Sequence, residues 1–132
     1  LDLQVMDHEA PWQPPRRCEV TPEEAEHAMA LAGAAMSHED FVSAVALWSR
    51  AMSTSPTAWQ LVKRAECLLR LGHATAAVCD CLSAAELNRN SVKAFKVCAQ
   101  AMLRLGDWEG ALSKIQLANR IDLDEESQAL ER

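Results

Sequence analysis

The sequence contains no tyrosine, two phenylalanines and four tryptophans, so aromatic side chains add little to any core. β-Branched residues are sparse and alanine is abundant, which favours helices over strands. No stretch of useful length alternates polar with apolar residues, as a strand would. With 132 residues, the chain has room for one domain with a modest core. We therefore expect an all-α domain.

Long apolar runs are missing too. No run reaches the length that spans a membrane, and no charged-then-apolar start resembles a signal peptide. The five cysteines are odd in number and scattered, which favours reduced thiols over a disulfide framework. These features predict a cytoplasmic protein that is not inserted in a membrane. Because the chain begins at Leu1 rather than methionine, we also expect it to be a fragment of a longer protein.

Signatures of catalysis and metal binding are absent from the sequence. No Gly-rich phosphate loop, nucleophile elbow or pair of carboxylates is visible, and the four histidines lie far apart. The nearest candidate for a metal motif is Cys79-Asp80-Cys81. Thiols two residues apart on a helix point about 200° apart, so we expect Cys81 to be buried and Cys79 to be exposed. The sequence predicts no enzyme, no metal site and no cofactor.

The net charge of −6 is unevenly distributed along the chain. Residues 1–40 and 122–132 carry balances of −7 and −4, whereas residues 41–121 carry +5. A basic middle between acidic ends favours an acidic protein partner over nucleic acid, which would require a denser basic patch.

What the sequence does contain is a helical hairpin that occurs three times. Aligning the chain with itself superimposes alanines at separations of 33 and 34 residues. The aligned sets are Ala32, Ala65 and Ala99; Ala44, Ala77 and Ala111; and Ala51, Ala84 and Ala118. Small residues in fixed positions are what close helix–helix contact requires. One larger apolar position is shared by Trp48, Cys81 and Ile115.

The third hairpin, from Ala94 to Asp122, has the most regular pattern. Its second helix carries an apolar stripe that we expect to be buried, made of Trp108, Ala111, Leu112, Ile115 and Ala118. Gly106 lies in the turn and aligns with Gly72, whereas Glu39 stands at this position in the first hairpin. After the third hairpin, residues 124–132 are predicted to begin a capping helix.

The start of the domain is marked by local signals. Thr21 and Glu24 have the spacing of a capping box, and Pro22 suits the first helical position. Three prolines before this point place residues 1–20 in an extended linker or arm.

The spacing of these paired helices resembles the tetratricopeptide repeat (TPR). This resemblance implies a right-handed superhelical solenoid of three repeats within a domain over residues 21–132. The repeats would span about 25–56, 58–89 and 92–123.

The first helices of such a solenoid line a concave groove that binds partners. In the register of the repeats, the expected partner-binding residues are Trp59, Lys63, Glu66, Lys93, Lys96 and Gln100. Three lysines and a tryptophan form a plausible protein-binding face. The alternative is that these lysines only keep the solenoid soluble, but the acidic ends of the chain favour a function for a basic groove.

Many co-chaperone TPR domains grip the acidic tail of a heat-shock chaperone through a carboxylate clamp of two lysines, two asparagines and an arginine. The corresponding residues here are Met29, Gly33, Lys63, Lys93 and Val97. Only Lys93 matches, so most of the charge-assisted hydrogen bonds of the clamp are lost. The sequence therefore disfavours tail binding.

Four stretches in order resemble the co-chaperone family of Hip, the heat-shock-cognate-interacting protein. They are residues 45–52, 63–65, 105–111 and 121–126. The resemblance implies a non-catalytic module that binds the ATPase domain of the heat shock protein 70 chaperone and stabilises its ADP-bound state. It also implies possible dimerisation through segments outside this chain. Two alternatives stay open: a generic TPR scaffold for another protein or peptide, and an accessory TPR domain of a larger enzyme.

Overall fold

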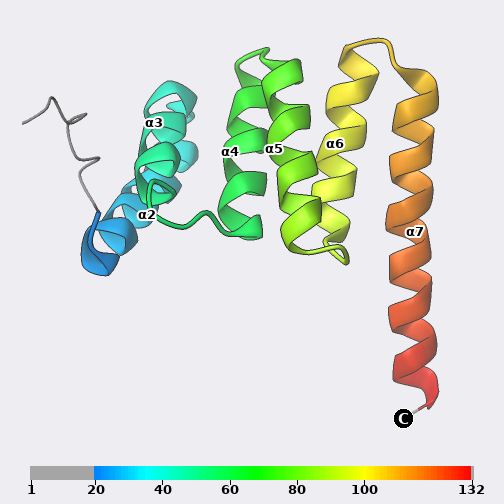
Figure 1. The fold of residues 1–132 in the computed structure, drawn as a ribbon. Coiled ribbons are helices and arrows are strands. Elements are labelled where there is room, and N and C mark those ends of the chain that lie inside the picture. The colour runs from blue at the N-terminus through cyan, green and yellow to red at the C-terminus, as the bar shows by residue number, and fades with distance from the viewer. Residues whose placement is uncertain (1–19, 132) are drawn as a thin grey trace, which may run out of the picture.

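Figure 1 shows the computed structural model, which describes residues 20–131. This part of the chain forms helices and contains no strand. The helices are α2 (Pro22–Ser37), α3 (Phe41–Ala51), α4 (Ala58–Arg70), α5 (Ala74–Leu87), α6 (Val92–Arg104) and α7 (Trp108–Glu131). They pack as the pairs α2–α3, α4–α5 and α6–α7, which succeed one another across the molecule. The predicted all-α class is confirmed, whereas the predicted arm lies outside the described residues except for Val20.

Polar caps fix where the helices begin. Thr21 Oγ1 accepts a hydrogen bond from the backbone N–H of Glu24 at 3.2 Å, and the Glu24 carboxylate accepts one from the N–H of Thr21 at 3.4 Å. Thr57 and Gln60 form a second capping box at the start of α4. Each box satisfies two backbone N–H groups. One belongs to the cap residue, and the other is an N–H in the first helical turn, which has no partner within the helix. The cap predicted at Thr21 is confirmed.

The turns within the three helix pairs all contain a residue with positive φ. Gly72 and Gly106 have φ of +84° and +80°, and Glu39 has φ of +58° at the aligned position. Glycine adopts this left-handed conformation freely, whereas a residue with a Cβ atom loses about 1 kcal/mol there. The first turn is therefore strained and the other two are not.

The core is built largely from small side chains. All nine alanines that the repeat aligns are buried, with at most 5% of their surface exposed. These small contacts let the helices pack closely. Among larger residues, Trp48 is enclosed near α4, where its ring meets Trp59 edge-on at a centroid distance of 5.3 Å. The burial pattern follows the predicted repeat through the first two helix pairs.

One ion pair is enclosed between the helices of the second pair. Arg64 on α4 donates hydrogen bonds to both carboxylate oxygens of Asp80 on α5, each at 2.7 Å, and to Ser49 Oγ on α3 at 3.1 Å. This bidentate geometry is the strong form of an ion pair. The hydrogen bonds to Asp80 raise the pKa of the Arg64 guanidinium above its ordinary value. The guanidinium therefore stays charged, and its hydrogen bonds tie α3, α4 and α5 together.

The cysteines lie as predicted, with Cys81 buried and Cys79 exposed. Burial raises the pKa of the Cys81 thiol to about 12 and that of Cys67 to about 11. Both thiols are therefore protonated and unreactive at neutral pH. Within residues 20–131, no group of three or more His, Cys, Asp or Glu side chains could hold a metal ion. In the same segment, no helix combines the length and the apolarity that crossing a membrane requires.

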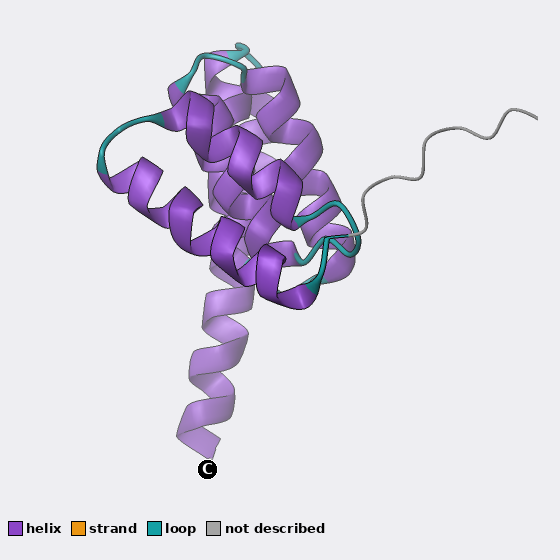
Figure 2. Ribbon diagram, turned by 90° about the vertical axis from the view of Figure 1, so that its left-hand side faces the viewer, coloured by secondary structure: helices purple, strands orange, loops and turns teal. Residues whose placement is uncertain are grey.

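The predicted capping helix is not a separate element. α7 continues without a break from Trp108 to Glu131, because residues 122–131 contain neither glycine nor proline to stop it. Figure 2 shows this C-terminal part projecting beyond the other helices. All side chains from Leu123 to Glu131 are exposed. This segment therefore extends the solenoid's last helix instead of covering its edge.

The prediction of a buried stripe on α7 is half wrong. Ala111 and Ala118 are buried, but Trp108, Leu112 and Ile115 are exposed. The cause is the position of α7 at the end of the array. In the described part of the chain, α6 is the one helix that packs extensively against it, whereas α3 and α5 are each flanked by two helices.

Candidate functional site

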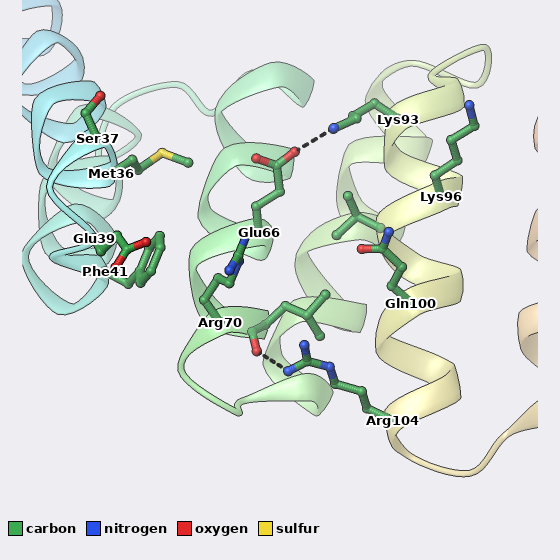
Figure 3. Close-up of a pocket in the computed structure, with 12 residues that line it drawn as sticks. Met36, Ser37, Glu39, Phe41, Glu66, Arg70, Lys93, Lys96, Gln100 and Arg104 are labelled. Carbon is green, nitrogen blue, oxygen red and sulfur yellow. Dashed lines mark hydrogen bonds and ion pairs between the residues drawn. The ribbon is translucent and has the colours of Figure 1, made fainter.

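A cavity of about 720 Å³ lies between the three helix pairs, on the side formed by α4 and α6. Its other wall comes from the last residues of α2, the following turn and the first residue of α3 (Figure 3). The charged lining residues are Glu39, Glu66, Arg70, Lys93, Lys96 and Arg104. The uncharged ones are Met36, Ser37, Phe41, Leu69, Val97 and Gln100. Four bases against two acids make this central cavity electropositive.

α4 and α6 each direct a row of polar side chains into the central cavity. Glu66 and Arg70 are four residues apart on α4, and Lys96, Gln100 and Arg104 have the same spacing on α6. Side chains four residues apart share one face of a helix. The two rows therefore face the cavity as a direct consequence of helix geometry.

The structure brings four of the six predicted site residues together. Glu66, Lys93, Lys96 and Gln100 line the central cavity, whereas Trp59 and Lys63 do not. Both lie on the same face of α4 as Glu66, Lys63 one turn before it and Trp59 two turns before it. Lys63 Nζ is 5.7 Å from the ring centroid of Trp59 and 3.8 Å from Glu66 Oε2. The exposed Trp59 is therefore connected to the cavity through a row of contacts along α4.

Two arginines of the central cavity were missed from the sequence. Arg70 and Arg104 come four residues after Glu66 and Gln100, so extending the predicted face by one helical turn would have included them. The lining residues around Glu39 could not be found this way, because they lie where α2 ends and α3 begins. Their position depends on how the first helix pair packs against the second.

Glu66 bridges lysines from two helices. Its Oε1 lies 3.2 Å from Lys93 Nζ on α6, and its Oε2 faces Lys63 on α4. The Glu66 side chain is mostly buried, whereas that of Lys93 is mostly exposed. Among the described residues no group donates a hydrogen bond to the buried Oε1, which leaves the ion pair with Lys93 as its main compensation. Lys93 is thus partly neutralised within the protein.

Both arginines of the cavity also have partners. Arg104 Nη1 donates a hydrogen bond to the backbone oxygen of Leu69 at 2.7 Å, in the last turn of α4, where carbonyl groups lack helical partners. The Arg70 guanidinium lies 5.8 Å from the ring centroid of Phe41, within the range of a cation–π contact. Lys96, in contrast, forms no ion pair with any residue in 20–131. It is the cation of the cavity that is most available to a partner.

The sequence has relatives among curated proteins, although no protein-family model matches it. It is 34% identical over 106 residues to the Hsc70-interacting proteins 1 and 2 of Drosophila melanogaster, which covers 80% of this chain and 28% of each relative. It is also 32% identical over 112 residues to the TPR repeat-containing thioredoxin TDX of Arabidopsis thaliana, covering 82% of this chain and 30% of that protein. The chain thus spans less than a third of the length of these relatives.

Solved TPR domains have the same fold. The TPR2AB domain of yeast Sti1, in complex with pHSP90, superimposes with a TM-score of 0.76 at 28% identity, covering 85% of this chain and 45% of the other. The TPR2B domain of the same protein, in complex with pHsp70, has a TM-score of 0.73 at 26% identity, with coverages of 81% and 88%. These superpositions confirm the predicted solenoid.

Proposed function

We propose, from the premise that this chain is a tetratricopeptide-repeat domain similar to the Hsc70-interacting proteins, that it is a non-catalytic co-chaperone module. It binds a heat shock protein 70 chaperone through the central cavity. The names of the Drosophila relatives and the pHsp70 complex of yeast Sti1 support this partner. The observation that carries the proposal is the electropositive cavity with Lys96 unpaired among the described residues. The proposed setting is the cytoplasm.

The finer proposal is that the bound surface is the ATPase domain of the chaperone and that binding stabilises its ADP-bound state. The alternative surface is the chaperone's acidic tail, and it is disfavoured by the residues that stand at the clamp positions. Val97 is buried, and Met29 Sδ accepts a hydrogen bond from the Gln60 side chain, so neither offers a donor to a carboxylate. Lys93, the one matching residue, is paired with Glu66. Tail recognition needs several convergent donors, and this cavity supplies fewer of them.

The proposed binding face consists of the cavity and the row on α4 that leads to it. It includes the six predicted residues Trp59, Lys63, Glu66, Lys93, Lys96 and Gln100, and it adds Arg70 and Arg104. The exposed ring of Trp59 would supply apolar contact at the edge, while the lysines pair with acidic groups of the partner.

Calorimetric titration with the isolated ATPase domain tests the proposal. We expect tighter binding in ADP than in ATP, and an equal gain in ADP affinity when the module is bound, because linkage is reciprocal. Equal affinity in both nucleotides would exclude stabilisation of the ADP state. Binding to the tail peptide alone would exclude the ATPase domain as the partner surface.

The contribution of the cavity is tested by reversing one charge. Lys96→Glu should weaken binding about 10-fold or more, since it places a like charge opposite an acidic partner. Arg89→Glu is the matched control, because it makes the same charge change at an exposed position between α5 and α6. Equal weakening by both variants would indicate a nonspecific charge effect and contradict the assignment of the cavity.

A second candidate is an accessory domain of a larger enzyme, favoured by the similarity to a TPR repeat-containing thioredoxin. In that case the cavity would bind a protein on which the attached catalytic domain acts. Failure of the ATPase domain and the tail peptide to bind would favour this candidate or a generic scaffold.

A further inference from the structure

The outer face of α7 is the counterpart of surfaces that are covered in the first two helix pairs. At the aligned position, Trp48 on α3 and Cys81 on α5 are each 1% exposed, whereas Ile115 on α7 is 39% exposed. The next helix in the array, α4 or α6, packs against α3 or α5. In the described part of the chain no helix takes this place beside α7 (Figure 1). The outer face of α7 therefore corresponds to a surface that binds a helix in the first two pairs.

This apolar face continues along the whole of α7. At 100° per residue, six of its positions lie within about 80° of one another around the helix. They are Trp108, Leu112, Ile115, Asn119, Leu123 and Leu130, and all are exposed. We call this set the α7 stripe. Glu126 is the one acidic residue within the same sector.

Four apolar residues of the α7 stripe are placed symmetrically about Asn119. Ile115 and Leu123 lie four residues to either side of it, and Trp108 and Leu130 lie eleven residues to either side. An antiparallel pair of such helices, related by a two-fold axis at Asn119, would therefore match apolar residues with apolar residues at these four positions. Both copies would use the same surface, as in the commonest type of dimer.

We propose that a second copy of this chain covers the α7 stripe in an antiparallel helix pair centred on Asn119. Ile115 packs on Leu123 of the second copy, and Trp108 packs on Leu130 of the second copy. The two Asn119 amides meet at the centre, where a polar pair in an apolar seam fixes the register. This inference concerns assembly and does not depend on the proposed chaperone partner.

The charges on α7 select the antiparallel direction. Its last part carries five acidic residues, whereas the part before them carries one acidic residue, Glu109, and two basic ones, Lys114 and Arg120. A parallel pair would place two acidic ends side by side. The antiparallel pair instead places each acidic end beside the more basic first part of the other helix. Figure 2 shows that this end projects beyond the other helices, so it can lie along a second copy.

The expected association is weak. A helix of 24 residues is about 36 Å long, and one pair of such helices buries less than the roughly 800 Å² per partner of a standard interface. Glu126 would also lie opposite Leu112 of the second copy, which opposes binding. We expect a dissociation constant on the order of 10–100 µM.

Sedimentation equilibrium of the 132-residue chain tests the pairing. We expect monomer at about 1 µM and mostly dimer at about 500 µM, given that dissociation constant. Leu123→Glu should weaken the dimer at least 10-fold, and Glu126→Leu should tighten it several-fold. The matched control is Gln128→Glu, which adds the same charge as Leu123→Glu at an exposed position on the opposite side of α7. Circular dichroism verifies that each variant is folded.

A chain that stays monomeric at the highest concentration would overturn the proposal. Equal effects of Leu123→Glu and Gln128→Glu would overturn it too, because they would show that the stripe is not the contact.

Disulfide trapping tests the direction of the pair. In a background with Cys18→Ser and Cys79→Ser, chains carrying Ile115→Cys and chains carrying Leu123→Cys are mixed and oxidised. The antiparallel arrangement predicts cross-links between the two kinds of chain, because only their cysteines come within disulfide distance. Cross-linking of Leu123→Cys chains mainly with one another would indicate a parallel pair and overturn the proposed register.

Discussion

The first and third helix pairs carry a large apolar residue at the same aligned position, yet their environments are opposite. Trp48 is enclosed by the helices around it, and Ile115 faces outward on α7. The difference lies in the neighbouring pair, because the packing of α4 against α3 has no described equivalent at α7. In a solenoid, the burial of a residue therefore depends on the next helix in the array as well as on its place in the repeat.

Two other aligned positions, one on each helix of a pair, are occupied by different kinds of residues in the three helix pairs. Arg64 and Asp80 form the enclosed ion pair of the second helix pair. The aligned residues are Leu31 and Leu47 in the first pair and Cys98 and Lys114 in the third. Leu31 and Leu47 both border a cavity of about 430 Å³. The same two positions thus hold an ion pair in the second helix pair, two leucines in the first, and a thiol with a lysine in the third.

The largest expected effect comes from the contrast between Trp48 and Ile115. Trp48→Ala should lower the free energy of unfolding by about 4 kcal/mol, because it leaves a cavity in the core. Ile115→Ala should lower it by less than about 1 kcal/mol, because the side chain is partly in water. Urea denaturation at low protein concentration measures both, and Trp48→Leu gives a milder version if Trp48→Ala does not fold. Equal losses at the two positions would contradict the comparison.

The ion pair of the second helix pair should be sensitive to single changes. Arg64→Ala is expected to lower the free energy of unfolding by about 3 kcal/mol, since it leaves the buried Asp80 carboxylate without its partner. Combining Arg64→Leu with Asp80→Leu, which copies the first pair, should restore most of the loss. Denaturation of the single and double variants measures this, and a double variant as unstable as the single one would show that the positions are not interchangeable.

The free energy of unfolding should depend on alkaline pH through the buried Cys81 thiol. The pKa of Cys81 is raised from 9.0 to about 12 by burial, so the unfolded chain loses this proton first as the pH rises. The stability that the neutral thiol contributes is present below pH 9 and is lost toward pH 12. Each such thiol lowers the free energy of unfolding by about 1.4 kcal/mol per pH unit in this range.

Urea denaturation under reducing conditions between pH 9 and pH 11 measures the effect. Cys81→Ala should make the decline with pH shallower by that amount per unit. Cys79→Ala on the same helix is the matched control. An unchanged slope in Cys81→Ala would show that this thiol does not stay protonated in the folded protein.

The smallest expected effect is in the turns. Glu39→Gly should raise the free energy of unfolding by about 0.5–1 kcal/mol, because it relieves the strain of a positive φ. Gly72→Ala should lower it by about 1 kcal/mol, and no atom near Gly72 would meet the added Cβ, so the effect is one of backbone conformation alone. Differential scanning calorimetry measures both shifts, which are expected to be opposite in sign.

Much of the fold is set by residues that act locally. The alanine period predicts the pairing of helices, and the burial of Ala32, Ala65 and Ala99 agrees with it. The capping box at Thr21 and the turn at Gly106 were also predictable, because caps and positive φ are set by a few neighbouring residues.

The candidate site was predictable where it runs along one helix face. Glu66, Lys93, Lys96 and Gln100 were found because α4 and α6 repeat the same register. Glu39 and Phe41 were not, because they lie in the turn after α2 and at the start of α3, whose position at the cavity depends on packing between pairs. The ion pair from Glu66 to Lys93, which leaves Lys96 as the available cation, also joins residues of different pairs.

The local sequence determines the repeat pattern of this protein, because helix periodicity, small residues and caps act over a few turns of chain. The exposure of Trp108 and Ile115, the uninterrupted run of α7 beyond the last hairpin and the charge balance of the central cavity depend on which helices meet. Those contacts join residues far apart in sequence, so they arise only when one helix pair packs on the next.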